Sequence, residues 1–299
     1  HRQRESDSAD GFDPLSNRPR VTLKPVSRGR SPTSDRHSMH LETLSLQIDR
    51  GVARITLKRP DNANAFNPAM AHELLQVAIA CDVDATIRVV LLDAEGRMFC
   101  AGGDLSHFAE AGSELAPLLK HMTVDLHAAI ARLARMRAPV IAAVQGAAAG
   151  AGFSLTTACD LVVAARSAKF TLAYTKAGLV PDGSSTYFLP RILGRRRALE
   201  LMLLNPVLTA EDAFQWGLVT RVVDDDALDA ESTALAQQIA QGPTAAYAAA
   251  KRLLLASEHE TLESQMELEA AAITEAATGL EGQEGIAAFL GKRPPRFQQ

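Results

Sequence analysis

The sequence predicts an α/β protein. Short apolar runs that are typical of strands, at 89–92 and 140–144, alternate with longer segments of helical spacing such as 114–137. Both apolar runs lead directly into glycine-rich turns, at 98–104 and 144–153. Because strands that alternate with helices are joined by right-handed crossovers, we expect βαβ connections in this protein.

The composition of the chain narrows its class. Its 299 residues, 47% hydrophobic and 22% charged, fit one large globular domain or two small ones. A formal net charge of −4 argues against a nucleic-acid partner, and no uncharged apolar run approaches the length of about 18 residues that a membrane helix needs. The cysteines Cys81, Cys100 and Cys159 lack the spacing of a metal site or a disulfide framework. We therefore expect no metal, no membrane contact and a reduced, cytoplasmic setting.

Residues 1–38 differ from the rest of the chain. They are rich in Arg, Ser, Asp and Pro and have no apolar period, so we predict a disordered N-terminal extension. This extension has no apolar centre of a signal peptide, and its acidic residues are atypical of a transit peptide. We expect a folded core at 39–235 and a helical C-terminal region at 236–299.

The first elements of the predicted core are a hairpin and a helix. Residues 44–48 and 52–57 alternate apolar and polar side chains around the turn at 49–51, which is typical of a β-hairpin. Asn67 followed by Pro68 is the pattern of a helix N-cap with proline in the first helical position.

Strands and helices then alternate along the chain. We expect a strand at 88–93, a long helix at 114–137, a strand at 139–144, a helix that opens at Gly150 and a strand at 160–164.

After about residue 195 the pattern becomes almost wholly helical. Thr209 has the context of an N-cap, and Gly217 that of a helix stop. Further helices are expected at 243–257, 259–278 and 282–291.

The two glycine-rich turns carry the strongest functional pattern. Glycine lets backbone approach a ligand closely and lets N–H groups point in one direction. Two such turns side by side can direct two N–H donors at one oxygen, which is the geometry of an oxyanion hole. Cys100 lies in the first turn, and we interpret it as a packing residue because no neighbouring His or Lys would activate its thiol.

Several segments resemble the crotonase, or enoyl-CoA hydratase/isomerase, family. The segment LKRPDNANAFN resembles the family's RP…NA loop, and FCAGGD resembles its first oxyanion segment. The matches follow the family's order and spacing and cover residues 41–297. The matching segments are 57–67, 99–104, 145–160, 170–194 and 285–293.

The resemblance implies a fold, an assembly and a ligand. The fold would be a crotonase-like spiral of ββα units, with C-terminal helices that pack between subunits in a homotrimer or hexamer. The ligand would be an acyl-CoA thioester, with no cofactor beyond the coenzyme A of the substrate itself. The family's oxyanion donors map to the backbone N–H groups of Gly103 and Ala151. Two donors there would stabilise the enolate that forms when a proton leaves the carbon beside a thioester.

The acid and base of the reaction are the variable part of the site. Family hydratases use two glutamates, but the matching positions here hold Ser154 and Tyr174. A free hydroxyl is a poor base near neutral pH, so hydration by the two-glutamate route is not expected.

Asp182 is the acid that remains at a meaningful position. Some family isomerases carry an acid there, and a double-bond shift needs a single base. We therefore predict a Δ3,Δ2-type enoyl-CoA isomerase with Asp182 as its base. Pro181-Asp182-Gly183 is also a turn signal, so a purely structural role stays open. Two other functions stay open as well: another single-acid reaction on a CoA thioester, or a non-catalytic acyl-CoA-binding homologue.

The remaining site candidates concern substrate binding. By resemblance and charge, Lys58 or Arg59 would pair with the CoA phosphates, Ala63 and Ala65 lie in the loop around the adenine and pantetheine, and Lys292 would reach a neighbour's ligand. Further candidates follow from their place beside the predicted donors or in the pocket; they are Ala101, Gly150, Tyr174 and Asp104, the last of which we also expect to cap the next turn or helix.

The histidines show no metal or triad spacing, so we predict surface or pocket-rim positions for them. These are His72, His107, His121 and His127.

Overall fold

A six-stranded sheet lies at the centre of the fold. The computed structural model describes residues 39–297, so the predicted extension at 1–38 falls outside the described residues. Neighbouring strands pair in the order β1-β2-β3-β4-β6-β9, antiparallel between the first two and parallel between the others. The strands are β1 (Leu44–Asp49), β2 (Val52–Leu57), β3 (Val89–Ala94), β4 (Val140–Val144), β6 (Leu161–Ala165) and β9 (Arg221–Val223).

A second, three-stranded sheet pairs β5 (Ala147–Ala149), β7 (Lys169–Thr171) and β8 (Leu208–Thr209). Strand β4 of the large sheet leads to β5 of the small one, and β6 leads to β7 in the same way. Each of these strand pairs is followed by a helix, so the predicted α/β class and the ββα units are confirmed. The region after residue 195 is less helical than predicted, because it also holds β8 and β9. These strands have only two or three residues, which is too short for an alternating pattern to show.

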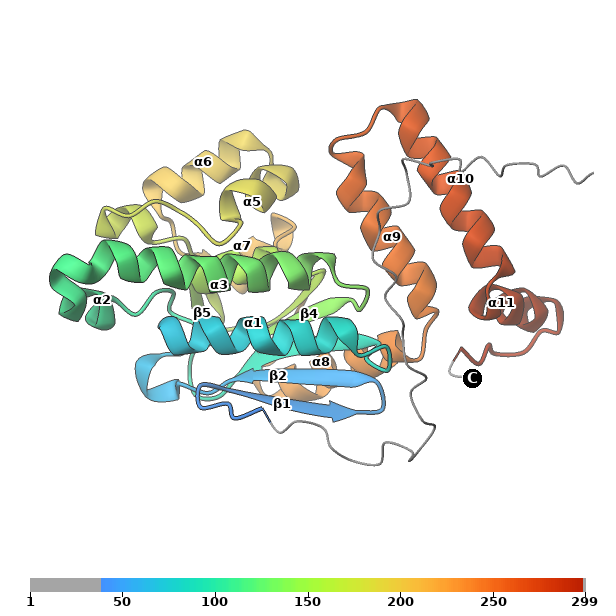
Figure 1. Cartoon of the computed structure of the whole chain (residues 1–299), viewed down its shortest axis with the longest axis horizontal. Coiled ribbons are helices and arrows are strands. Elements are labelled where there is room, and N and C mark those ends of the chain that lie inside the picture. The colour runs from blue at the N-terminus through green and yellow to red at the C-terminus, as the bar shows by residue number, and fades with distance from the viewer. Residues whose placement is uncertain (1–38, 298–299) are drawn as a thin grey trace, which may run out of the picture. The chain divides into compact units, whose positions relative to one another are not determined.

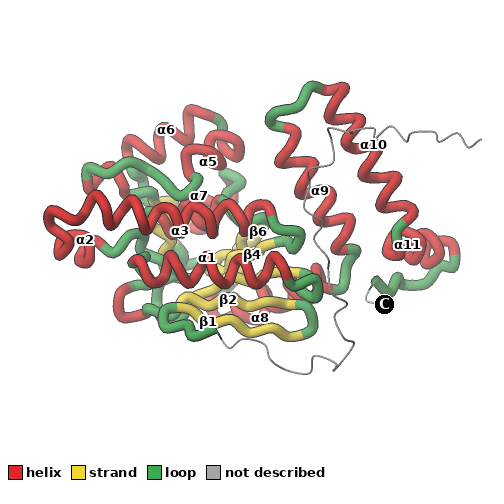
Figure 2. Tube along the Cα trace, in the orientation of Figure 1, coloured by secondary structure: helices red, strands yellow, loops and turns green. Residues whose placement is uncertain are grey.

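Two long helices cover one face of the large sheet. Helix α1 (Pro68–Val83) and helix α3 (Leu115–Arg135) pack side by side, in blue and green in Figure 1. The Asn67 side chain accepts a hydrogen bond from the N–H of Met70, which confirms the predicted N-cap of α1. In Figure 2 these two helices lie in front of the strands, whereas α8 (Leu228–Ala240) packs against β2, β3, β4 and β6 from behind.

Buried aromatic side chains anchor the segments around the glycine turns. Phe99, Phe153 and Phe170 are all 1% exposed or less. The rings of Phe153 and Phe170 lie 5.7 Å apart, centre to centre. Burial of one such side chain stabilises a fold by about 1.5–3 kcal/mol, so the turns are held by core packing on both sides.

The C-terminal helices α9 (Thr244–Ser257), α10 (Leu262–Thr278) and α11 (Leu280–Leu290) confirm the three helices expected there. The predicted boundary at residue 235 falls inside α8, and the residues from Leu41 onward form one compact unit. Lys251 ties α9 to the sheet, since its buried Nζ donates a hydrogen bond to Asp160 Oδ2 at 2.6 Å.

Five shorter helices complete the fold: α2 (Leu105–Ala111), α4 (Ala151–Thr157), α5 (Ser185–Leu193), α6 (Arg195–Leu204) and α7 (Ala210–Gln215). Thr209 forms a capping box at the start of α7, and Gly217 follows its end with a φ of +83°, as expected for this stop. Within residues 39–297, no helix has both the length and the apolar character that a bilayer crossing demands.

Candidate functional site

The two glycine turns meet in the structure. The N–H of Ala149 donates to the carbonyl of Cys100 at 2.8 Å, which joins the second turn to the first. Gly102 has a φ of +104°, and a Cβ there would lie 3.3 Å from Gly150 Cα and 3.4 Å from the nitrogen of Ala151. Glycine at this position therefore allows the close approach of the two turns.

Two backbone N–H groups stand free at this junction. Within residues 39–297, neither the N–H of Gly103 nor that of Ala151 donates a hydrogen bond to another protein atom. Ala151 is the first residue of α4, and a helix leaves the N–H groups of its first turn without intrahelical partners. A Cβ on Gly103 would lie 2.7 Å from Phe108 Cε2, so a side chain there would require the Phe108 ring to move.

A cavity of about 280 Å³ opens beside these two donors. Most of its lining is apolar and comes from α2, α3 and the loop 172–182. Within the described part of the chain, Asp182 supplies the one carboxylate in this lining. The predicted site residues that line it are Ala101, Gly103, Gly150, Ala151, Tyr174 and Asp182.

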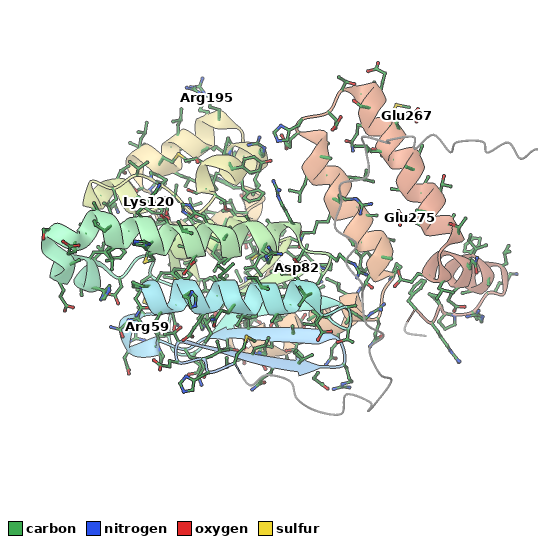
Figure 3. All side chains as sticks on the ribbon, viewed as in Figure 1. Arg59, Asp82, Lys120, Arg195, Glu267 and Glu275 are labelled. Atoms are coloured by element: carbon green, nitrogen blue, oxygen red, sulfur yellow. The ribbon has the colours of Figure 1, made fainter. Side chains whose placement is uncertain are left out.

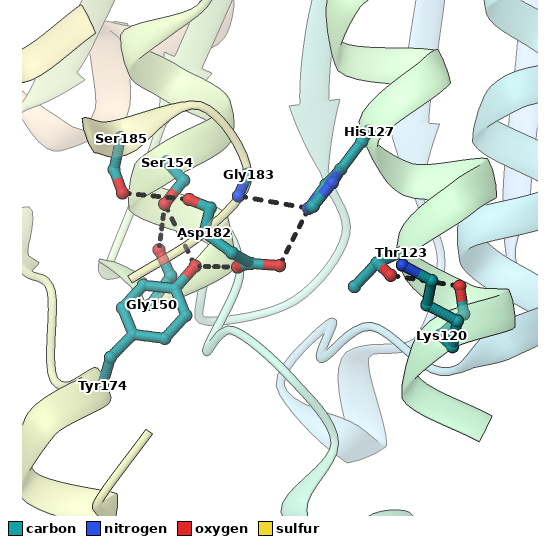
Figure 4. A network of polar contacts seen from close by, with 9 residues as sticks. All are labelled: Lys120, Thr123, His127, Gly150, Ser154, Tyr174, Asp182, Gly183 and Ser185. Atoms are coloured by element: carbon teal, nitrogen blue, oxygen red, sulfur yellow. Dashed lines mark hydrogen bonds and ion pairs between the residues drawn. The ribbon is translucent and has the colours of Figure 1, made fainter. Parts of the chain in front are cut away.

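Both oxygens of the Asp182 carboxylate are held by other side chains (Figure 4). The phenol of Tyr174 donates to Oδ1 at 2.7 Å, and His127 Nε2 lies 2.9 Å from Oδ2. An ionised carboxylate only accepts hydrogen bonds, so Nε2 carries the hydrogen of that contact. With its hydrogen directed at Asp182, the same Nε2 cannot also accept from the backbone N–H of Gly183, which lies 3.4 Å away. The carboxylate is fixed in one orientation at the edge of the cavity.

Tyr174 acts in this network as a donor. Burial raises the pKa of Tyr174, and the negative charge of Asp182 raises it further. The phenol therefore keeps its proton at neutral pH and cannot replace a carboxylate as base. Its hydrogen points to Asp182. The hydroxyl of the fully buried Ser154 lies 3.1 Å from the phenol oxygen and 3.3 Å from the Gly150 carbonyl, and its single hydrogen is shared between these two acceptors. Ser154 and Tyr174, the positions that the resemblance matches to the glutamates of family hydratases, thus form a pair of linked hydroxyls.

The predicted turn around Asp182 is also present. Gly183 has a φ of +58°, and the N–H of Ser185 donates to the Asp182 carbonyl at 3.2 Å. The backbone of Asp182 makes the turn, while its side chain faces the cavity. Asp182 therefore has a structural role in the turn and also a position in the site.

His127 is the residue whose role the sequence did not reveal. It is exposed and lies at a pocket rim as expected, but its partner Asp182 is 55 positions away. One signal was present: His127 follows the cavity-lining Thr123 by four residues, so both lie on the same face of α3.

The predicted CoA-contacting residues lie outside this cavity lining. Arg59, in the loop before α1 (Figure 3), donates to Asp104 Oδ2 at 2.9 Å and to the carbonyl of Ala65. Asp104 also accepts from the N–H of His107, which confirms its capping role at α2. Burial acts to raise the pKa of Asp104, but the hydrogen bonds from Arg59 and from the His107 N–H, together with the charges of these two residues, outweigh it and lower that pKa. The Arg59 guanidinium is therefore engaged in holding the loop.

Asn64 organises the same loop and was not singled out in the sequence. Its side-chain amide donates to the carbonyl of Met98 at 2.8 Å, and its Oδ1 accepts from the N–H of Arg59 at 2.7 Å. The carbonyl of Ala63 accepts from the N–H of Ala101 at 3.0 Å, which ties the loop to the first glycine turn. The other predicted binding residues, Lys58 and Lys292, are exposed.

Cys100 lies in the first glycine turn and is fully buried. Burial raises the pKa of Cys100 to about 12, and a Cβ on Gly152 would lie 2.5 Å from the carbonyl oxygen of Cys100. Cys100 is thus the packing residue that we expected. In the part of the chain from residue 39 to residue 297, no group of three or more His, Cys, Asp or Glu side chains is placed to hold a metal ion.

Comparison with known proteins fits the geometry of this site. A family model described as enoyl-CoA hydratase/isomerase matches residues 47–299. The chain belongs to the enoyl-CoA hydratase/isomerase family. Its similarity to the solved structure of an enoyl-CoA hydratase from Polaromonas sp. JS666 has a TM-score of 0.81 at 35% identity, over 85% of this chain and 98% of the other. The fold is therefore the crotonase fold.

Curated relatives in this family carry different activities in their names. The 1,2-epoxyphenylacetyl-CoA isomerase of Escherichia coli K12 is 40% identical over 259 residues, which span 86% of this chain and 98% of that protein. The 4-chlorobenzoyl coenzyme A dehalogenase-2 of an Arthrobacter species is 35% identical over 240 residues, 80% of this chain and 85% of that protein. This family member is thus an enzyme of the acyl-CoA class, and the residues of its own site must decide between the reactions.

Proposed function

We propose that this protein is an enoyl-CoA isomerase of the Δ3,Δ2 type. The observation that carries the proposal is the place of Asp182: it is the one carboxylate lining a cavity that also holds the free N–H groups of Gly103 and Ala151. A base beside two unpaired donors suits a reaction that makes and then quenches an enolate.

The proposed reaction moves one proton across the acyl chain. Asp182 takes a proton from C2 of a 3-enoyl thioester, and the electron pair moves onto the carbonyl oxygen. The N–H groups of Gly103 and Ala151 donate to that oxygen, and each such donor lowers a barrier by about 3–4 kcal/mol. Asp182 then returns the proton at C4, and the double bond comes to lie between C2 and C3. No cofactor is needed beyond the coenzyme A of the substrate.

The neighbours of Asp182 support this single-base route. Tyr174 and His127 hold the two oxygens of the carboxylate, which positions it for repeated proton transfer. Hydration of a double bond would need a second group to activate water, and the lining formed by residues 39–297 holds no second carboxylate.

The test incubates the purified protein with a 3-enoyl-CoA and, in parallel, with a 2-enoyl-CoA. The products are separated by chromatography and identified by mass. We expect conversion of the 3-enoyl substrate to the 2-enoyl product with little 3-hydroxyacyl-CoA. Faster formation of 3-hydroxyacyl-CoA than of the isomer would refute the isomerase. Binding of both thioesters without turnover would instead assign a non-catalytic acyl-CoA-binding role.

A second candidate function rests on His127. A carboxylate beside an imidazole can also act as a nucleophile, whose covalent intermediate is then cleaved by water that the imidazole deprotonates. The relative named 4-chlorobenzoyl coenzyme A dehalogenase makes a halogenated aromatic acyl-CoA the appropriate probe. Release of chloride from 4-chlorobenzoyl-CoA at a rate above that of isomerisation would favour this reaction.

We also propose that the protein works in the cytoplasm as a homotrimer or hexamer. Large apolar side chains stand exposed along α10 and α11, and their burial between subunits would be favourable; they include Leu262, Met266, Ile273, Leu280, Phe289 and Leu290. All three cysteines are free thiols, which suits a reducing compartment. Light scattering after size exclusion measures the oligomer, and cell fractionation the compartment.

A further inference from the structure

A second cavity, of about 620 Å³, lies between α3, α5 and α9. It shares no lining residue with the 280 Å³ cavity. The two are nevertheless neighbours, because His127 lines the larger one and Asp182 lines the smaller one, and the side chains of these two residues form a hydrogen bond. The larger cavity is within the range of volumes that bind small molecules.

The lining of this larger cavity is strongly basic. It includes the guanidinium-bearing residues Arg135, Arg137 and Arg252 and, among the residues that the structure describes, no Asp or Glu. All three arginines are exposed, and within residues 39–297 none of them forms an ion pair or a hydrogen bond with a protein atom through its side chain. By contrast, Arg191 of α5 is paired with Glu258 at 3.1 Å. We call the larger space the arginine cavity. Three like charges around one space repel each other, and an anion between them would offset that repulsion.

Neutral donors at the same place also favour an anion. Ser184 lines the cavity directly before α5 and has a φ of +75°, which is rare for a residue with a side chain. Strained backbone of this kind is concentrated at functional sites. The hydroxyl oxygen of Ser184 is buried and has no hydrogen-bond partner within the described residues. The N-terminus of α5, a helix of nine residues, adds a partial positive charge.

We propose that the arginine cavity binds an oxyanion, and that its occupant during turnover is a carboxylate at the far end of the substrate's acyl group. This proposal rests on the proposed function, since it takes Asp182 as the group that acts on the middle of the acyl chain. In this proposal the thioester would lie at Gly103 and Ala151 and the reacting carbons at Asp182. The His127 side chain, which contacts Asp182 and lines the arginine cavity, would mark where the far end of the acyl group passes towards the arginines. The substrate class is then a 3-enoyl-CoA that carries a terminal carboxylate.

The chemistry of arginine supports that choice. A guanidinium binds a carboxylate through two parallel N–H···O bonds, and such charge-assisted bonds are the stronger ones in proteins. The net charge of the chain is −4, so a basic cluster free of acids is not explained by the general charge of the surface. Free phosphate has related chemistry, and the experiment below separates it from a substrate carboxylate.

The experiment measures kcat/KM for two series of 3-enoyl-CoA substrates of matched chain lengths, one ending in a carboxylate and one in a methyl group. It compares the natural protein with Arg252→Gln and with Arg196→Gln. Arg196 is an exposed arginine of α6 outside the lining of the arginine cavity, so it is the matched control. The natural protein and the control should prefer the best carboxylate substrate by about tenfold or more, as expected for a hydrogen bond to a charged group. Arg252→Gln should lose most of that preference and leave kcat/KM for the methyl series unchanged.

The outcomes separate this proposal from the proposed function. Turnover of the methyl series with no preference for carboxylate at any length keeps the isomerase and overturns the carboxylate substrate. If neither series turns over, calorimetric Kd values replace kcat/KM, and equal Kd values for both series overturn the proposal. Inhibition by inorganic phosphate that Arg252→Gln abolishes, without a carboxylate preference, would assign the cavity to a free anion and also overturn it.

Discussion

Two histidine–aspartate pairs involve helix α3, and the distance between the contacting nitrogen and oxygen is the same in both. His127 Nε2 lies 2.9 Å from Asp182 Oδ2, and His72 Nδ1 lies 2.9 Å from Asp125 Oδ2. The second pair bridges α1 and α3 and is completed by Gln76, whose amide lies 3.0 Å from the other ring nitrogen of His72. The first pair stands beside a cavity with two free backbone donors.

A His–Asp contact of this length does not by itself distinguish the two pairs. What separates the pairs is their surroundings: the Asp182 carboxylate also accepts from the buried phenol of Tyr174 and lines the cavity of Gly103 and Ala151. Asp125 lines neither cavity described above. The account therefore predicts that equal substitutions in the two pairs have unequal effects, and that the surface pair supplies the controls.

The largest effect is expected for Asp182→Asn. Loss of a general base lowers a rate by about 10²–10⁴-fold, so kcat for isomerisation should fall by that factor. Asp125→Asn removes the carboxylate of the other pair and should change kcat by less than about twofold. Steady-state kinetics on a 3-enoyl-CoA measure both. Full activity in Asp182→Asn would end the single-base account.

A loss of about 10²–10³-fold in kcat is expected for Gly103→Ala. The new Cβ would press on Phe108 and displace a backbone donor, and the loss of one oxyanion donor has this cost. Gly285→Ala is the control, because a Cβ there meets only ordinary contacts, the nearest at 3.5 Å. An active Gly103→Ala variant would show that the first glycine turn does not hold the enolate.

A smaller effect, about tenfold in kcat with KM unchanged, is expected for His127→Asn. His127 positions the carboxylate without replacing it as base, so its loss removes one hydrogen bond to a charged group. His72→Asn tests the matched contact on the surface and should change neither constant. Equal losses in the two variants would mean that His127 acts only on stability.

The smallest effect on activity is expected for Glu73→Gln, which tests a carboxylate with a structural role. Burial acts to raise the pKa of Glu73, but hydrogen bonds from the Thr43 hydroxyl and from three backbone N–H groups outweigh it and lower that pKa. A lowered pKa means that the ionised group stabilises the fold above its unfolded pKa of about 4.3 and loses that effect as the pH falls through the folded value. The substitution should cost about 1–3 kcal/mol of unfolding free energy at neutral pH. Urea unfolding should show a smaller difference below about pH 4, with kcat unchanged throughout. A difference that does not shrink on acidification would contradict the role of this carboxylate.

Local patterns of the sequence predicted much of the fold. The hairpin, the cap at Asn67 and the helices after Pro243 depend on neighbouring residues, so periodicity and capping chemistry reveal them. The strands of the small sheet were missed because each has three residues or fewer and is fixed by pairing between distant segments.

The residues of the site also divide into those with a local sequence signal and those that depend on distant packing. The glycine turns and Asp182 were predictable because each has a local backbone signature that also matches the family. The link from Asp182 to His127 was not, because it depends on how α3 packs against the loop before α5. Asn64 was missed for a similar reason, since its hydrogen-bond partners at Glu95 and Met98 are more than thirty residues away.

The most direct test of the central claim follows the C2 protons of a 3-enoyl-CoA in D₂O by NMR. The account predicts that the natural protein and Asp125→Asn remove those protons at catalytic rates, while Asp182→Asn leaves them in place. Removal of the C2 protons by Asp182→Asn at the natural rate would contradict the claim that the Asp182 carboxylate is the base that makes the enolate.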